Sequence, residues 1–339
     1  MAVRDGQRWL RAAVDSVLAQ TFADFELLII DDGSTDETPR ILAEYDTRDR
    51  RVRVLTQGQE GLAHALNRGL AAAAGSLIAR LDADDEALPQ RLRHQVDYLH
   101  AHPDIVLLGS WAQVIDEQGR VMHRRLRPPT ESRSLAEVVL PRTNPFVHSS
   151  VMFRAAAARG AGGYRPALEM AEDYDLWLRL CERGQIAILP EILVHYRRHG
   201  GNVSKTKAVS QIFAARLARL SYAARRDTGQ DPCAALLAPP EWRAADATMF
   251  YADDARLCRM LELADPAIAD TIAPPLVDIE VISRRVAELT HAEKKLAQSA
   301  LINVLRRRRG GAGYSRNALF GLLFRLDPVR ALRLIWRAL

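Results

Sequence analysis

The first two hundred residues alternate between short apolar runs and segments with helical periodicity, and this alternation constrains the fold more than any other feature. Apolar runs too short for helices occur at residues 25–30, 52–55, 77–81 and 105–108. Segments with helical spacing of apolar residues lie at 10–18, 34–45, 61–74 and 89–100. We therefore expect an α/β fold in which helices flank a mostly parallel sheet.

One helix start carries a more detailed signal. Ser34 and Glu37 have the spacing of a capping box, which predicts a helix that begins there and runs to about Tyr45.

Beyond about residue 204 the strand pattern stops. The remaining sequence indicates helices separated by loops that contain Pro232, Pro239 and Pro274. We expect an α/β domain over residues 1–204 and a helical accessory region over 205–339.

Composition excludes several classes of protein. A net charge of +5 over 339 residues and an aromatic content of 6% do not indicate a nucleic-acid partner. There is no run of about 18 apolar residues and no signal-peptide pattern. Cys181, Cys233 and Cys258 lack metal-ligand spacing, so we expect free thiols in a cytoplasmic protein. Only four of the 47 basic residues are lysines, a bias typical of GC-rich bacterial genomes.

Three acidic clusters follow an apolar run or precede a helical segment, and ligands of open α/β sheets bind beyond the carboxyl ends of the strands. The clusters are Asp31-Asp32, Asp82-Ala83-Asp84 with Asp85 adjacent, and Glu172-Asp173.

The chemistry of each cluster suggests a role. Asp82 and Asp84 project to the same side of an extended segment, where a divalent cation on a diphosphate would offset their repulsion. The first cluster could accept hydrogen bonds from a base or ribose. A carboxylate in the third, at a helix N-terminus, could act as a general base. Taken alone, the first cluster favours a binding role over simple helix capping, whereas the third favours simple helix capping.

The order of these motifs resembles the inverting nucleotide-sugar transferases of glycosyltransferase family 2, which have the GT-A (Rossmann-like) fold. The matching segments are SVLAQT at 16–21, FELLIIDDGSTD at 25–36, Gly61-Leu62-Ala63 with Asn67, LDADD at 81–85, HSSVMFR at 148–154, EDYDLW at 172–177 and YRRH at 196–199 with Asn202 and Ser204. The resemblance covers residues 1 to about 204 and does not extend into the helical region.

The resemblance implies roles on the donor side of the site. Asp32 would contact the nucleotide base, with Asp31 beside it, and Asp82 would contact the ribose. Asp84 would hold Mg²⁺ or Mn²⁺ on the donor diphosphate, and His199 would reach the metal or the diphosphate.

It also implies roles for the remaining motif residues. Asp173 would be the general base that deprotonates the acceptor hydroxyl, supported by Glu172. Arg197 and Arg198 would neutralise phosphate. We expect acceptor contacts from residues 142–148 and from the helical region.

The implied reaction is transfer of a sugar, with inversion, from a UDP-, GDP- or dTDP-sugar to a hydroxyl of a glycan or lipid-linked acceptor. Bacterial cell-surface polysaccharide synthesis is the implied context. The QxxRW signature of processive synthases is absent, which favours addition of a single sugar.

The sequence departs from the family pattern at its N-terminus. Residues 1–6 correspond to the end of the family's first strand, so we expect that strand to be missing through truncation or a misassigned start codon. Arg4 and Asp5 replace the usual aromatic residue and Asn of the first loop. A non-catalytic nucleotide-sugar or glycan-binding relative is therefore one alternative, and a nucleotidyltransferase is another.

The C-terminal segment 329–339 has the pattern of a basic amphipathic helix. Arg330, Arg333 and Arg337 share one helical face, opposite a face of apolar residues. Such a helix can pack on its own domain, on a partner in a homodimer, or on the cytoplasmic face of an anionic membrane.

Overall fold

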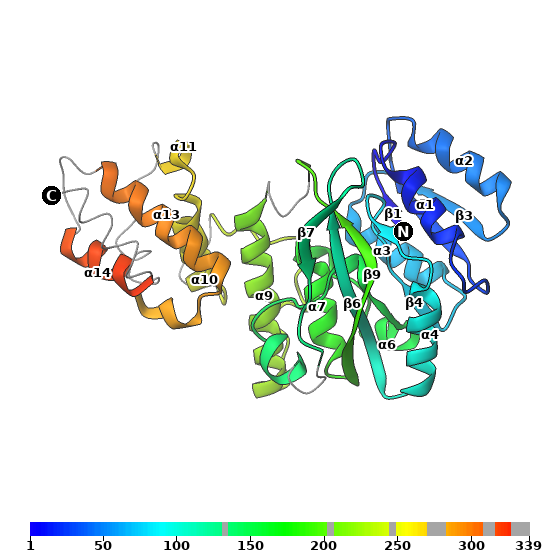
Figure 1. Cartoon of the computed structure of the whole chain (residues 1–339). Helices are drawn as coiled ribbons and strands as arrows, with labels where there is room; N and C mark the ends of the chain where they lie inside the picture. Colours follow the sequence, from blue (N-terminus) through cyan, green and yellow to red (C-terminus); the bar gives the residue numbers. More distant parts are fainter. Residues whose placement is uncertain (131–134, 202–206, 244–248, 270–282, 308–315, 327–339) are drawn as a thin grey trace.

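The computed structural model describes residues 1–130, 135–201, 207–243, 249–269, 283–307 and 316–326. Figure 1 shows a large α/β body and a smaller helical body, with the helix α9 between them. The segment 329–339, for which the amphipathic helix was expected, lies outside the described residues.

A three-stranded parallel sheet forms from the N-terminal part of the chain, in the order β1-β2-β3. Its strands are β1 (Ala2–Val3), β2 (Leu27–Asp32) and β3 (Val52–Gln57), and the helices connecting them are α1 (Leu10–Leu18) and α2 (Thr38–Arg48). Every residue of β2 is buried, which explains its continuous apolar run. The expectation of a missing first strand needs correction, because Ala2 and Val3 form a two-residue strand parallel to β2.

A second, six-stranded sheet has the order β4-β8-β6-β9-β5, with β7 paired to β6. Its strands are β4 (Leu77–Ala79), β5 (Glu86–Ala87), β6 (Ile105–Ile115), β7 (Val121–Leu126), β8 (Met152–Arg154) and β9 (Gln185–Arg197). Among the described strands of this sheet, only β6 and β9 pair in parallel.

The expectation of a mostly parallel sheet therefore holds for the first sheet alone. A tight turn at residues 116–119, with Gly119 at φ +81°, returns the chain from β6 directly into β7. Parallel strands need a long crossover connection, and this turn provides none.

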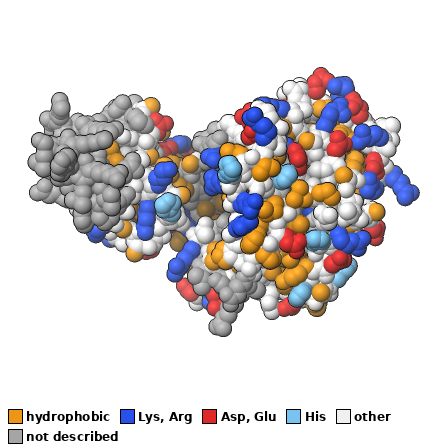
Figure 2. All heavy atoms as spheres, in the orientation of Figure 1, with side chains coloured by type: hydrophobic (Ala, Val, Ile, Leu, Met, Phe, Trp, Pro, Cys, Tyr) orange, Lys and Arg blue, Asp and Glu red, His pale blue; other side chains and the backbone are white. Residues whose placement is uncertain are grey.

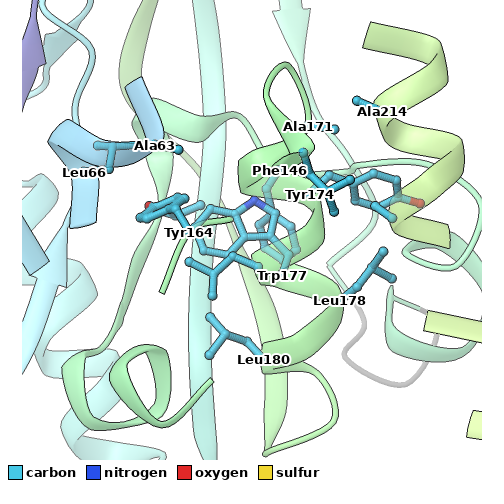
Figure 3. Packing of buried hydrophobic residues seen from close by; sticks show 14 of the residues in the cluster. Ala63, Leu66, Phe146, Tyr164, Ala171, Tyr174, Trp177, Leu178, Leu180 and Ala214 are labelled. Atoms are coloured by element: carbon cyan, nitrogen blue, oxygen red, sulfur yellow. The ribbon is translucent and has the colours of Figure 1, made fainter. Parts of the chain in front are cut away.

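The α/β body also contains α3 (Leu62–Ala72), α4 (Arg91–Ala101), α6 (Ala155–Gly160) and α7 (Glu172–Leu180). Trp177 of α7 is fully buried and lies at the centre of the core (Figure 3). Its ring centroid is 5.7 Å from that of Phe153 and 6.3 Å from those of Phe146 and Tyr164. This packing anchors the helix that begins with Glu172 and Asp173.

The predicted capping box does not form, and α2 begins four residues later than the pattern indicated. Ser34 Oγ instead accepts a hydrogen bond from the N–H of Asp5, at 2.9 Å. The N–H of Thr38, the first residue of α2, donates to Asp36 Oδ1 at 2.8 Å. The Ser34 side chain therefore bonds to Asp5, 29 residues away, and does not cap α2.

The C-terminal part is helical, as expected, with helices α9 (Ala208–Thr228), α10 (Ala252–Glu262), α11 (Pro266–Ala269), α13 (His291–Arg307) and α14 (Arg316–Leu326). Helix α9 packs on α7, and its Phe213 and Leu217 belong to the core of the α/β body. A separate apolar cluster joins α10, α13 and α14 around Leu261, Leu301 and Leu323. The three cysteines are free thiols.

The surface mixes charges of both signs. On the face shown in Figure 2, basic and acidic side chains are interspersed around apolar ones. Among the described residues, no helix combines the length and the apolar character that crossing a membrane requires.

Candidate active site

The three acidic clusters meet in one cavity of about 860 Å³ beyond the carboxyl ends of β2 and β4. Asp32, Asp82, Asp84, Glu172 and Asp173 all line it. The crevice also includes Lys207 and Gln211, so the helical region contributes to its wall.

Asp32 ends β2 and is held by the loop before α3. Its Oδ1 accepts hydrogen bonds from Gln57 Nε2 at 2.8 Å and from the N–H of Glu60 at 2.9 Å, and its Oδ2 accepts one from the N–H of Gly61 at 3.0 Å. Gly61, at φ +98°, adopts a backbone conformation that other residues rarely reach. Asp31, by contrast, does not line the cavity; it accepts a hydrogen bond from the N–H of Ser34.

The second cluster gathers three carboxylates, because oxygens of Asp82, Asp84 and Asp85 lie within 4.8 Å of one another. Asp82 forms an ion pair with Arg80 and accepts a hydrogen bond from Ser149 Oγ at 2.8 Å. Burial is the largest single influence and would raise the pKa of Asp82, but the charges of Arg80 and His148, together with the hydrogen bonds from Arg80 and Ser149, lower it on balance.

The neighbouring carboxyls behave differently. Burial and the negative charge of Asp82 raise the pKa of Asp84, against the opposing hydrogen bond to His199 Nε2 at 2.8 Å. Burial and the negative charges of Asp82 and Asp84 raise the pKa of Asp85 well above its usual value. Asp85 accepts a hydrogen bond from the N–H of Arg197, and its buried Oδ2 has no hydrogen-bond partner.

These residues fit a divalent cation. Three clustered carboxylates, one with an orphaned buried oxygen, are costly without a positive charge between them. Their hard oxygen donors are the ligands that Mg²⁺ and Mn²⁺ prefer. Asp85 was given no role from the sequence, although it directly follows the predicted metal ligand.

The two predicted phosphate-binding arginines lie in different places. Arg198 lines the cavity. The Arg197 guanidinium is buried under it, where it donates to the carbonyl of Asp84 at 2.8 Å and forms an ion pair with Glu86. Arg197 therefore supports the loop of the second cluster. Arg4, Arg124 and Lys207 are further cavity-lining cations, which the motifs did not mark.

The third cluster opens α7. Asp173 Oδ2 accepts a hydrogen bond from Asn144 Nδ2 at 2.9 Å, and its Oδ1 accepts one from the N–H of Tyr174 at 2.6 Å. Burial raises the pKa of Asp173 to about 6 despite these two bonds. Burial and the adjacent Asp173 raise the pKa of Glu172 to about 8. Asn144 lies in the loop expected to contact the acceptor, but no motif identified it.

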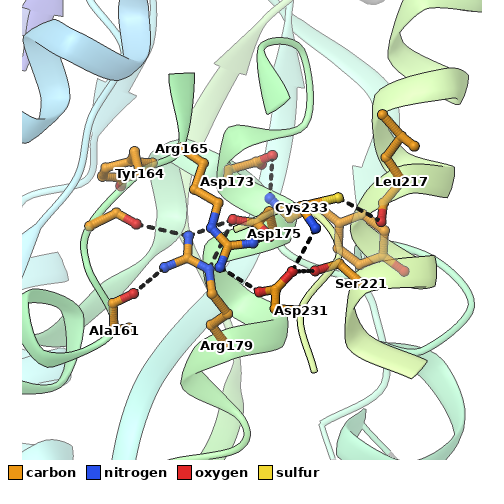
Figure 4. A network of polar contacts seen from close by, with 12 residues as sticks. Ala161, Tyr164, Arg165, Asp173, Asp175, Arg179, Leu217, Ser221, Asp231 and Cys233 are labelled. Atoms are coloured by element: carbon orange, nitrogen blue, oxygen red, sulfur yellow. Dashed lines mark hydrogen bonds and ion pairs between the residues drawn. The ribbon is translucent and has the colours of Figure 1, made fainter. Parts of the chain in front are cut away.

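A buried ion-pair network holds the first turns of α7 (Figure 4). Arg179 pairs with the fully buried Asp175 and donates to the carbonyls of Ala161 at 2.6 Å and Gly163 at 2.8 Å. Arg165 connects Asp175 to Asp231, which follows α9. The network fixes the helix that carries Asp173 between the α/β core and α9.

Comparison with known proteins identifies the fold and the family. The family model of glycosyl transferase family 2 matches residues 1–159. The O-antigen biosynthesis glycosyltransferase WbnJ of Escherichia coli is 34% identical over 61% of this chain and 81% of its own. The amylovoran biosynthesis glycosyltransferase AmsE of Erwinia amylovora is 33% identical over 60% of this chain and 76% of its own.

Among solved structures, Staphylococcus aureus TarS 1–349 in complex with UDP-GlcNAc has a TM-score of 0.55 and 13% sequence identity. The match covers 88% of this chain and 89% of that one, which confirms the expected GT-A-like α/β fold with its helical C-terminal region. The family match, the relatives and the fold agree, and this chain belongs to glycosyltransferase family 2.

Proposed function

We propose that this protein is an inverting, metal-dependent glycosyltransferase that adds a single sugar from a nucleoside-diphosphate sugar to a hydroxyl of a glycan or lipid-linked acceptor. Bacterial cell-surface polysaccharide synthesis is the proposed context, and the biosynthetic names of WbnJ and AmsE support it. The observation that carries the proposal is the single crevice shared by Asp32, Asp84 and Asp173.

The donor would bind at the carboxyl ends of β2 and β4. In this arrangement, Asp32 lies near the base and Asp82 near the ribose, while Asp84 and Asp85 hold the cation. When bound, the cation stabilises negative charge on the diphosphate leaving group. Arg198 and Lys207 line the same cavity and add positive charge.

The acceptor hydroxyl would attack the anomeric carbon from the face opposite the diphosphate. Its proton moves to Asp173 as the new C–O bond forms, and the bond to the diphosphate oxygen breaks with its electron pair leaving on the nucleoside diphosphate. Attack from the opposite face inverts the anomeric carbon, so one catalytic carboxylate suffices. A pKa of about 6 leaves Asp173 ionised at neutral pH and able to accept the proton.

The proposed boundary near residue 204 separates a donor-binding part of the chain from the helical region. Residues before it would bind the donor and hold the base. The start of the helical region would contribute to acceptor binding, and the presence of Lys207 and Gln211 on the cavity wall supports this.

The test is a screen of UDP-, GDP- and dTDP-sugars for Mn²⁺-dependent donor hydrolysis by the purified chain. Asp84→Ala should abolish hydrolysis, and Asp173→Asn should reduce acceptor-dependent transfer while donor binding is retained. The matched control is Asp97→Asn, which changes an exposed acid on α4, outside the cavity. Donor binding without hydrolysis in the wild type would instead indicate a non-catalytic relative, and release of pyrophosphate would indicate a nucleotidyltransferase.

A further inference from the structure

Asn144 lies in a loop whose position determines whether its side chain reaches Asp173. The loop, residues 140–147, follows the helical turn Leu135–Val139 and ends at the turn His148–Ser150. We call this segment the Asn144 loop. Contacts that fix its backbone also fix the amide that donates to Asp173.

Two side chains from outside the loop bind its backbone carbonyls. Tyr174 of α7 donates through its hydroxyl to the carbonyl of Leu140 at 2.6 Å. Arg219 of α9 donates through Nη1 to the carbonyl of Arg142, also at 2.6 Å. Arg142 is two residues before Asn144 in the sequence. Tyr174 thus attaches the beginning of the loop to the α/β body, and Arg219 attaches its middle to the helical region.

The guanidinium of Arg219 is itself fixed by a second helix. Its Nη2 donates to Glu293 Oε1 of α13 at 3.1 Å, and the Glu293 side chain is only 1% exposed. The other carboxylate oxygen of Glu293 accepts a hydrogen bond from the N–H of Thr290 at 2.6 Å. A planar guanidinium presents its donors in a fixed geometry, so one arginine can bind two acceptors at once. Arg219 therefore connects the Asn144 loop to α13.

The Glu293 carboxylate belongs to a buried ion-pair network of the C-terminal helices. Burial would raise the pKa of Glu293, but the charges of Arg216 and Arg219 lower it on balance together with its hydrogen bonds. Arg216 also pairs with Asp254 of α10, and Asp254 pairs with Arg285. Figure 1 shows α9 between the α/β body and these helices. The attachment point of Arg219 is thus held from α9, α10 and α13 together.

Arg219 lies outside the cavity wall, so it can act on Asp173 only at a distance or through the loop. The charged and titratable groups that face Asp173 or share its cavity come from several other elements. They are Arg80 and Asp82 after β4, Tyr164 and Glu169 before α7, Glu172 on α7, Arg198 after β9 and Lys207 before α9. Removal of the Arg219 side chain leaves all of them in place.

We propose that Arg219 is a positioning residue of the transferase site, which holds the Asn144 loop so that the amide of Asn144 donates to Asp173. The proposal rests on the proposed role of Asp173 as the general base. Through Arg219, the helical region orients the base without contacting it. Arg219 transmits the position of α13 to the loop, because Glu293 and the carbonyl of Arg142 bind the same guanidinium.

The test measures the titration of Asp173 directly, by carbon NMR of chains with labelled aspartate carboxyl groups. The signal of Asp173 is the one lost in Asp173→Asn. Arg219→Ala releases the carbonyl of Arg142 and should weaken the bond from Asn144, which stabilises the ionised carboxylate. The pKa of Asp173 should therefore rise from about 6 by at least ~0.3.

The pH profile of acceptor-dependent transfer gives a second measurement. On the acid limb, kcat/KM of Arg219→Ala should fall at least about twofold relative to the wild type. The matched control is Arg226→Ala, which removes another arginine of α9 whose guanidinium contacts Tyr222. It should change neither the titration of Asp173 nor the profile.

Loss of the Arg219 charge would also raise the pKa of Asp173 directly, and a double variant separates the two effects. If Arg219 acts through Asn144, the double variant Asn144→Ala/Arg219→Ala should have the same Asp173 pKa as Asn144→Ala alone. A direct charge effect would add in full to that of Asn144→Ala, and this result overturns the proposal. An unmoved Asp173 pKa in folded Arg219→Ala also overturns it.

A second substitution guards against a loss of packing. Arg219→Met keeps an apolar side chain of similar reach and should raise the pKa of Asp173 as Arg219→Ala does. The NMR titration does not depend on turnover. A wild-type chain that transfers no sugar would contradict the proposed function, whereas the response of Asp173 to Arg219→Ala would still decide whether Arg219 positions the loop.

Discussion

The hydrogen bond between Asn144 and Asp173 lowers the pH at which the proposed base becomes active. Asn144 Nδ2 donates to Asp173 Oδ2 at 2.9 Å and stabilises the ionised carboxylate, which lowers its pKa against the effect of burial. The substitution Asn144→Ala removes this donor and leaves the second bond, from the N–H of Tyr174, in place.

The expected shift follows from the strength of such bonds. A hydrogen bond to a charged group contributes roughly 1.5–3 kcal/mol, and one pKa unit corresponds to about 1.4 kcal/mol. Because both side chains border the cavity, where water can replace part of the lost bond, we take the lower figure. The pKa of Asp173 should therefore rise by about one unit, from about 6 to about 7.

The assay is the pH profile of kcat/KM for acceptor-dependent transfer, whose acid limb reports the base of the free enzyme. In the wild type, kcat/KM should rise with pH through about 6, and in Asn144→Ala through about 7, with the same plateau at high pH. Thr143→Ala, in the adjacent exposed position, serves as the control and should leave the profile unchanged. An unmoved acid limb combined with a uniform loss of rate would refute the assignment of Asp173 as the titrating base.

Three further predictions concern stability. The pKa of Glu172 is about 8 in the folded chain and 4.5 ordinarily, so the folded state binds this proton more tightly than the unfolded state does. The resulting contribution to stability is lost as the pH rises from about 4.5 to 8. In urea denaturation, Glu172→Gln should have the same free energy of unfolding as the wild type near pH 4.5 and a higher one at pH 8. Arg179→Ala leaves the fully buried Asp175 without its main partner and should lower the free energy of unfolding by about 3 kcal/mol. A loss below about 1 kcal/mol would contradict the importance of that ion pair. Leu301→Ala, in the cluster of the C-terminal helices, should cost about 2–5 kcal/mol by chemical denaturation while nucleotide binding, measured by calorimetry, is retained.

Much of the candidate site was predictable because its acidic residues lie at the ends of apolar runs or at the start of a helical segment. Asp31-Asp32 and Asp82 follow apolar runs, and Asp173 opens a segment with helical spacing of apolar residues. Each position depends on neighbours a few residues away, and the geometry of α/β sheets then brings strand ends together. The structure places Asp32, Asp82 and Asp173 on one cavity.

The remainder depends on contacts that no local pattern records. Asn144 reaches Asp173 from a loop 29 residues away, and nothing in its surroundings distinguishes it from other loop residues. The three-residue strand β8 is too short for periodicity, and its antiparallel pairing with β4 arises only from the tertiary arrangement. The capping-box prediction was wrong for the same reason, because Ser34 Oγ accepts a hydrogen bond from the N–H of Asp5, which is distant in the sequence.

Arg80 links the proposed donor site to the buried amine of Met1. Its charge is the main force that keeps Asp82 ionised despite burial, and it lowers the pKa of the buried Met1 amine as well. Neither its Nε nor its Nη2 has a hydrogen-bond partner in the described part of the chain, so its ion pair with Asp82 holds the guanidinium in place. The charge state of the second acidic cluster therefore depends on a buried cation whose own hydrogen-bond donors are only partly satisfied among the described residues.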